Sequence, residues 1–119
     1  MVHGIDHEAI PYYLNASNVL VLASIKEGSP NIIKEALACN LPIVSTDVGD
    51  VKELTQGVQG CKIVARDKNA IAKAVRDILD NFKRTNGRTV IQHLSLESVA
   101  EKLIEFYRHI IASKMFEKV

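Results

Sequence analysis

The stretch Glu27-Gly28-Ser29-Pro30-Asn31-Ile32-Ile33-Lys34-Glu35-Ala36 joins a predicted strand to a predicted helix. Residues 18–23, directly before it, form a continuous apolar run with β-branched side chains, which is typical of a strand buried on both faces of a parallel sheet. Ser29 is a good N-cap residue, and Pro30 then takes the first helical position, where its missing N–H costs nothing. This order points free backbone N–H groups and the positive end of the helix dipole out of the sheet, which favours an anion such as phosphate.

Two carboxylates frame this anion site, Glu27 before the helix and Glu35 within it. An ionised carboxylate only accepts hydrogen bonds, so the pair suggests a ligand that carries hydroxyls next to phosphate: a ribose, a sugar, or both. The alternative is structural. Glu27 would then be a charge that favours the helix dipole, and Glu35 a solvated residue that pairs with Lys34 or another neighbour. The spacing alone leaves both interpretations open.

The rest of the chain alternates predicted strands and helices. Residues 2–5 are expected to be the end of a strand. Further strands are expected at 41–45 and at 61–65, and turns at 46–50 and 57–60. The first expected helical segment begins after an Asp6 cap, with a restart at Pro11. Further helices are expected at 51–56, after an Asp67 cap, through Val90 and Ile91 after a break at 86–88, and after a Ser95 cap. The last helix carries an apolar stripe made by Leu96, Val99, Leu103, Phe106 and Ile110.

This alternation predicts an α/β fold: one domain over residues 1–119, a three-layer Rossmann-like parallel sheet with helices on both faces. Ligands of such sheets bind beyond the carboxyl ends of the strands. The turns at 27–31 and 46–50 both fall at that edge. Two separate parts of the sequence therefore indicate the same site.

Composition limits the classes of function. The chain has 119 residues and a net charge of +1, which argues against a nucleic-acid partner, because such partners favour strongly basic domains. No apolar run approaches the roughly 20 residues that span a bilayer. Cys39 and Cys61 lack a metal-ligand spacing and are expected to be small core residues in a reducing compartment. We therefore expect a cytoplasmic protein.

Several stretches together resemble the donor-binding part of the retaining glycosyltransferases of family 4, which have the GT-B fold. The stretches are residues 15–24, 27–31, 35–46, 48–49 and 53–54. Glu27 and Glu35 match the E-x7-E motif of that family, and the resemblance runs from about Val2 to Ile111.

The chain departs from the family pattern at three places. The family often has a bulky apolar residue where this chain has Ser29, and Gly-Gly where it has Gly49-Asp50. It often has Ala-Asp where this chain has Ser17-Asn18. These departures bear on the preferred donor more than on the fold.

The resemblance implies a role for each motif residue. Glu35 would bind the ribose hydroxyls of a nucleotide, Glu27 would bind the donor sugar and act as the catalytic residue, and the intervening backbone would contact sugar and phosphate. The implied donor-binding residues are Glu27, Gly28, Ser29, Pro30, Asn31, Ile32 and Glu35. The reaction would transfer a sugar from a UDP-, GDP- or ADP-sugar to a hydroxyl in polysaccharide, lipopolysaccharide or glycolipid synthesis. No cofactor and no metal are expected.

A GT-B enzyme also needs an amino-terminal domain that binds a sugar or lipid-linked acceptor. We therefore expect this chain to be the C-terminal part of a longer enzyme and to be inactive alone, with peripheral association of the full enzyme at the cytoplasmic membrane face as a further expectation. Self-association through a Val2–Ile5 edge or the Met115–Phe116 end is also expected. Two alternatives stay open: a GT-B-type sugar-nucleotide epimerase and a non-catalytic nucleotide-binding module.

Overall fold

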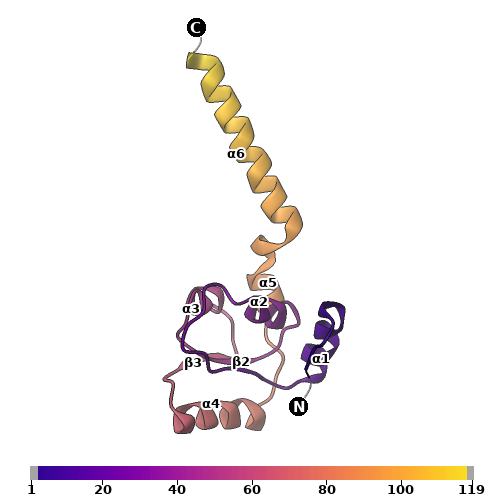
Figure 1. The fold of residues 1–119 in the computed structure, drawn as a ribbon, viewed down its shortest axis with the longest axis vertical. Helices are drawn as coiled ribbons and strands as arrows, with labels where there is room; N and C mark the ends of the chain where they lie inside the picture. Colours follow the sequence, from indigo (N-terminus) through magenta and orange to yellow (C-terminus); the bar gives the residue numbers. More distant parts are fainter. Residues whose placement is uncertain (1–2, 118–119) are drawn as a thin grey trace.

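A parallel three-stranded sheet carries helices on both faces (Figure 1). The computed structural model describes residues 3–117. The sheet comprises β1 (Leu20–Leu22), β2 (Ile43–Thr46) and β3 (Cys61–Val64). The helices are the 3-10 segments η1 (His7–Ala9) and η2 (Gln92–Leu94), with α1 (Ile10–Ala16), α2 (Asn31–Ala38), α3 (Val51–Leu54), α4 (Lys68–Asp80), α5 (Gly87–Val90) and α6 (Leu96–Glu117). The predicted α/β class is confirmed.

The strand order is β1-β2-β3, and every pairing is parallel. Leu20 pairs with Ile43, and Ile43 in turn pairs with Cys61, so the carboxyl ends of all the strands meet at one edge. The loop 23–30 and the turn 47–50 both leave the sheet there. This is the arrangement that the sequence predicted for a ligand site.

The sheet separates two apolar clusters, which makes the fold three-layered. On one face, β2 contributes Ile43 to a core that also holds Ile33 and Leu37 of α2 and Val51 of α3. On the other face, Val44 packs against Ala74 and Ile78 of α4. Because successive residues of a strand point to opposite faces, neighbouring residues of β2 serve different layers. Figure 1 shows α4 beneath the sheet, α2 and α3 on the opposite side, and α1 beside the sheet.

The strand predicted at residues 18–23 is shorter in the structure and is not buried on both faces. Only Leu20–Leu22 form β1, and 44% of Val21 is exposed. The cause is the placement of α4, which packs against β2 and β3 and leaves this face of β1 open. The apolar run correctly indicated a strand, but burial of an edge strand depends on helices from elsewhere in the chain.

Helix capping was predicted correctly at two sites and wrongly at two. The Asp67 carboxylate accepts the Ala70 N–H at 2.9 Å, and the Ser95 hydroxyl accepts the Ser98 N–H at 3.2 Å. Ser29 does not cap α2, because the N-cap residue is Pro30 and no side chain caps this helix. Asp6 precedes η1 but makes no side-chain cap either.

The ends of the chain differ from expectation. Val2 of the predicted strand 2–5 lies outside the described residues, and residues 3–5 form no strand.

The predicted break at 86–88 contains the start of α5. This helix packs closely on α2, since a Cβ on Gly87 would lie 2.8 Å from the Leu37 carbonyl oxygen.

The last helix projects away from the sheet (Figure 1). The predicted stripe is on α6 but is mostly exposed there, with 81% of Leu96 and 59% of Phe106 accessible. No helix within residues 3–117 is long and apolar enough to cross a membrane.

Candidate functional site

The N-terminus of α2 offers free hydrogen-bond donors at the carboxyl edge of the sheet. Within the described residues, the N–H groups of Asn31 and Ile32 have no protein acceptor, and no side chain caps the helix. The Ile33 N–H donates to the Pro30 carbonyl at 3.1 Å. Uncapped N–H groups and the helix dipole together attract an anion. The free helix start predicted from the sequence is therefore present, although it begins at Asn31.

Glu27 lies on the exposed loop in front of this helix. Its Oε1 accepts a hydrogen bond from the Ser24 hydroxyl at 2.9 Å. The Ser24 carbonyl in turn accepts from the Thr46 hydroxyl at 2.8 Å, which ties the loop to the end of β2. The carboxylate is therefore held at the sheet edge while its other oxygen remains available to a ligand hydroxyl.

Glu35 lies on the second turn of α2, and its side chain is 25% exposed. Its Oε1 is 3.4 Å from Nε2 of His7, which comes from η1. The sequence predicted neither this partner nor its element. The carboxylate is more enclosed than a fully solvated helix residue, and it faces the η1 side of α2.

The remaining predicted residues fall into two groups. Gly28, Ser29 and Asn31 are exposed and open to a ligand. Pro30 is buried, and Ile32 packs against the apolar cluster between the sheet and α2. Both residues therefore anchor the backbone at the start of α2 to the core. This division suits a loop that would bind a ligand through its main chain.

A second turn, residues 47–50, lies directly against this loop. The Asp50 N–H donates to the Gly28 carbonyl at 3.1 Å, and the Ser29 hydroxyl donates to Oδ2 of Asp50 at 2.5 Å. Gly49 has φ +52°, and a Cβ there would lie 1.9 Å from the Gly28 oxygen, so only glycine allows this contact. The sequence placed both turns at one edge but did not single out Asp50 as a site residue. The only signal was the departure from Gly-Gly.

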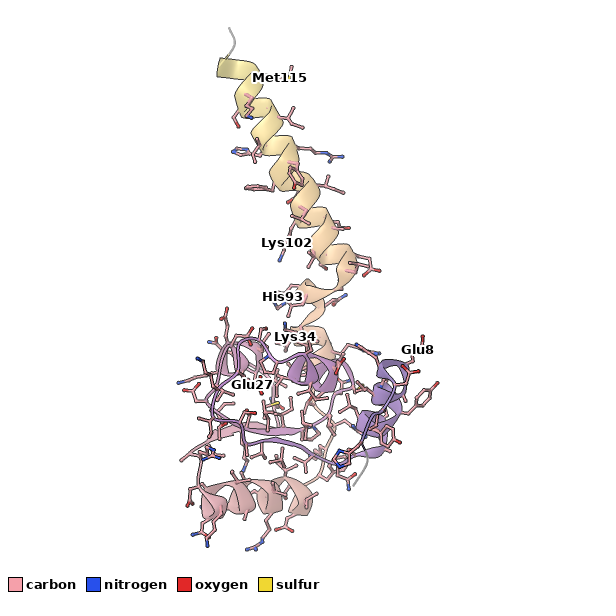
Figure 2. The ribbon with its side chains drawn as sticks, in the orientation of Figure 1. Glu8, Glu27, Lys34, His93, Lys102 and Met115 are labelled. Carbon is pink, nitrogen blue, oxygen red and sulfur yellow. The ribbon has the colours of Figure 1, made fainter. Side chains whose placement is uncertain are left out.

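Open space adjoins this edge. A cavity of about 430 Å³ lies between α2, α3 and η2, lined by Lys34, Asp50, Glu53, Leu54, Gln56, Val90, His93 and Leu94. Figure 2 shows Lys34 and His93 near the junction with α6, and Glu27 on the domain below. Sequence reasoning did not identify His93. Within residues 3–117, no group of three or more His, Cys, Asp or Glu side chains could hold a metal ion.

The uncapped helix start and its two carboxylates lie at the carboxyl edge of a parallel sheet, which is where ligands of Rossmann-like folds bind. Residues 1–81 match the family model described as "Glycosyl transferases group 1". The chain belongs to this family of glycosyl transferases. The predicted resemblance to a GT-B glycosyltransferase is confirmed, whereas the narrower assignment to family 4 stays a prediction.

Individual relatives agree with the family. The chain is 40% identical over 63 residues to TuaC of Bacillus subtilis (strain 168), a protein named as a teichuronic acid biosynthesis glycosyltransferase. It is 51% identical over 35 residues to an uncharacterized glycosyltransferase of Methanocaldococcus jannaschii. These matches cover 53% and 29% of this chain, but only 16% and 9% of the relatives.

A solved structure is also similar. Sucrose-phosphate synthase from Thermosynechococcus elongatus superposes with a TM-score of 0.81 at 33% sequence identity. The match covers 94% of this chain and 30% of that chain. This chain thus spans less than a third of the length of each of these three relatives.

Proposed function

We propose that this chain forms the nucleotide-sugar-binding part of a retaining glycosyltransferase with the GT-B fold. The observation that carries the proposal is the uncapped start of α2, with Glu27 in front of it and Glu35 on its second turn. Membership of the group 1 family supports a sugar-transferring enzyme. The location that fits this role is the cytoplasm or the cytoplasmic membrane face.

The donor would bind along α2. Its diphosphate would accept hydrogen bonds from the free N–H groups of Asn31 and Ile32. The sugar would lie on the Glu27 side and the ribose on the Glu35 side, where each carboxylate accepts hydroxyl protons. Gly28 and Ser29 would border the ligand with their backbone. No metal is required in this arrangement, because the helix start supplies the positive potential.

In the reaction, the bond between sugar C1 and the diphosphate oxygen breaks, and the diphosphate leaves with the bonding electrons. The acceptor hydroxyl oxygen bonds to C1 on the same face and passes its proton to the departing diphosphate oxygen. Hydrogen bonds from N–H groups to the leaving oxygen become stronger as negative charge develops on it, which lowers the activation barrier of the transfer. Glu27 would lie beside the sugar ring, where its charge stabilises the positive charge that develops there. The acceptor would be bound by an amino-terminal domain of the longer enzyme.

The test is donor turnover by the longer enzyme that carries this segment. The enzyme is incubated with UDP-glucose, GDP-mannose and ADP-glucose together with sugar and lipid-linked acceptors, and free nucleoside diphosphate and glycosylated product are measured. Glu27→Gln should abolish transfer, whereas Glu101→Gln on the exposed face of α6 should not. Release of diphosphate with an epimerised free sugar would indicate an epimerase instead. Binding without any turnover would indicate a non-catalytic module.

A further inference from the structure

We propose that Ser29 and Asp50 form a clasp that positions the donor loop before any ligand binds. The inference rests on the proposed function, because it assigns these side chains to the placement of Glu27–Pro30 at the donor site. Ser29 and Asp50 are positioning residues in this proposal: they act through the loop rather than on the reacting atoms.

The clasp is made of contacts between the loop and the following turn. The side-chain contact is the 2.5 Å hydrogen bond from the Ser29 hydroxyl to Oδ2 of Asp50. The backbone contact is the 3.1 Å bond from the Asp50 N–H to the Gly28 carbonyl. Gly49 also lies close to the Gly28 carbonyl, so the loop and the turn are in direct backbone contact. A hydrogen bond to a carboxylate is stronger than one between neutral groups, so the side-chain contact helps to hold the loop against the turn.

The loop needs such support because its own elements provide little. Residues 23–30 contain no helix or strand, and residues 25–29 are exposed. Pro30 is the buried residue at the end of the loop. The N–H groups at the start of α2, which follow it, have no capping side chain to fix their orientation. A tie to the turn after β2, whose residues Ser45 and Thr46 are buried, transfers the rigidity of the central strand to the loop. Preorganised donors are what makes such a site effective.

The Asp50 carboxylate has a further feature that fits a fixed position. Its Oδ1 is buried and has no hydrogen-bond partner within the described residues. A buried unpaired oxygen is destabilising, so the side chain would turn outward unless the bond from Ser29 and the packing of the turn held it. The bond from Ser29 is therefore one of the contacts that hold the Asp50 side chain in this position, at some cost in stability.

The experiment uses this chain and the substitutions Ser29→Ala, Ser29→Thr and Ser17→Ala. Ser17 is the matched control, because its hydroxyl donates a 2.7 Å hydrogen bond to Tyr13 on α1, away from the loop. The first measurement is hydrogen exchange of the Asp50 amide, which reports directly on its bond to Gly28. Ser29→Ala should speed this exchange about tenfold, as expected for loss of a hydrogen bond to a charged group. Ser29→Thr keeps the hydroxyl and should exchange like the wild type.

The second measurement is the affinity for UDP, GDP and ADP, taken at a temperature where every variant is folded. Ser29→Ala should weaken binding of the preferred nucleotide several-fold, and Ser29→Thr should restore it. Unchanged Asp50 exchange in Ser29→Ala, or an equal rise in Ser17→Ala, would overturn the clasp. Faster exchange with unchanged affinity would overturn the proposal that the clasp positions the donor loop for binding. If the wild-type chain binds none of the three nucleotides, the proposed function fails, and the exchange data alone decide whether the clasp exists.

Discussion

The imidazole Nε2 of His7 lies 3.4 Å from Oε1 of Glu35, which connects η1 to the second turn of α2. The His7 side chain is 82% exposed and that of Glu35 is 25% exposed. A contact near the surface between side chains of this kind contributes little to stability, typically about 0–1 kcal/mol. The contact therefore orients the Glu35 carboxylate more than it stabilises the fold, which allows its role in binding to be tested separately.

We expect Glu35→Gln to weaken binding of a nucleoside diphosphate by about 1–3 kcal/mol, the usual loss when a charged hydrogen-bond partner is removed. The free energy of unfolding should change by less than about 1 kcal/mol. Calorimetric titration of this chain with UDP, GDP and ADP measures the first quantity, and urea denaturation measures the second. Glu101→Gln is the control on α6. Equal affinities of Glu35→Gln and the wild type would favour the alternative of a structural helix residue.

The glycines of the two turns should respond differently to alanine. At Gly49, φ is +52° and the new Cβ would lie 1.9 Å from the Gly28 oxygen, so the turn has to move. We expect Gly49→Ala to lower the free energy of unfolding by more than about 2 kcal/mol. A Cβ on Gly28 meets nothing within 4 Å. Gly28→Ala should therefore unfold near the wild-type urea midpoint, and any loss it shows should be in nucleotide-sugar binding.

The thiol of Cys61 predicts a pH dependence. Burial raises its pKa from 9.0 to about 11, partly offset by a hydrogen bond with the Ile43 backbone. Between these two values the unfolded thiol releases its proton while the folded thiol keeps it, so stability falls as pH rises. Urea denaturation from pH 8 to pH 11 should show a steeper fall for the wild type than for Cys61→Ala. Parallel curves would contradict the raised pKa.

The same shift makes Cys61 a poor nucleophile. At pH 8 the folded thiol should carry about a hundredfold less thiolate than an ordinary cysteine, since each pKa unit changes the fraction tenfold. Labelling with a disulfide reagent, followed by mass spectrometry, should therefore modify Cys61 slowly until denaturant is added. Both cysteines are free and partly buried, in agreement with the prediction of small core residues.

The local pattern of the chain was sufficient for the strand–turn–helix order and for the sheet edge that carries the site. An apolar run and Pro30 act within a few residues, so their consequences can be read from the sequence. The partners of the site residues could not be predicted in the same way. Ser29 and Asp50 are 21 positions apart, and their bond exists only because β1 and β2 end side by side. A residue with good capping propensity thus bonds elsewhere when tertiary contacts offer a carboxylate.

Burial was also decided by packing rather than by pattern. The stripe on α6 has the apolar spacing of a buried helix face, yet Leu103 is 50% exposed, because α6 projects away from the rest of the chain. The same holds for Val21 on β1. Periodicity identifies the face that favours burial, but what covers that face is determined by other segments.

The exposed stripe leads to a prediction of self-association at high concentration. Leu96, Val99 and Leu103 follow a spacing of three and four residues, as in helices that pair along an apolar seam. Met115, near the far end of α6 in Figure 2, is 69% exposed, so the previously expected Met115–Phe116 route remains a prediction, although the Phe116 side chain lies outside the description. The alternative route through a strand at 2–5 is disfavoured, because residues 3–5 form no strand.

Sedimentation over a wide concentration range should show a dimer or larger species in the wild type. Leu103→Glu should shift the chain toward monomer with the sheet domain intact, whereas Lys102→Glu on the same helix should not. A single monomeric wild-type species at every concentration would exclude pairing through α6.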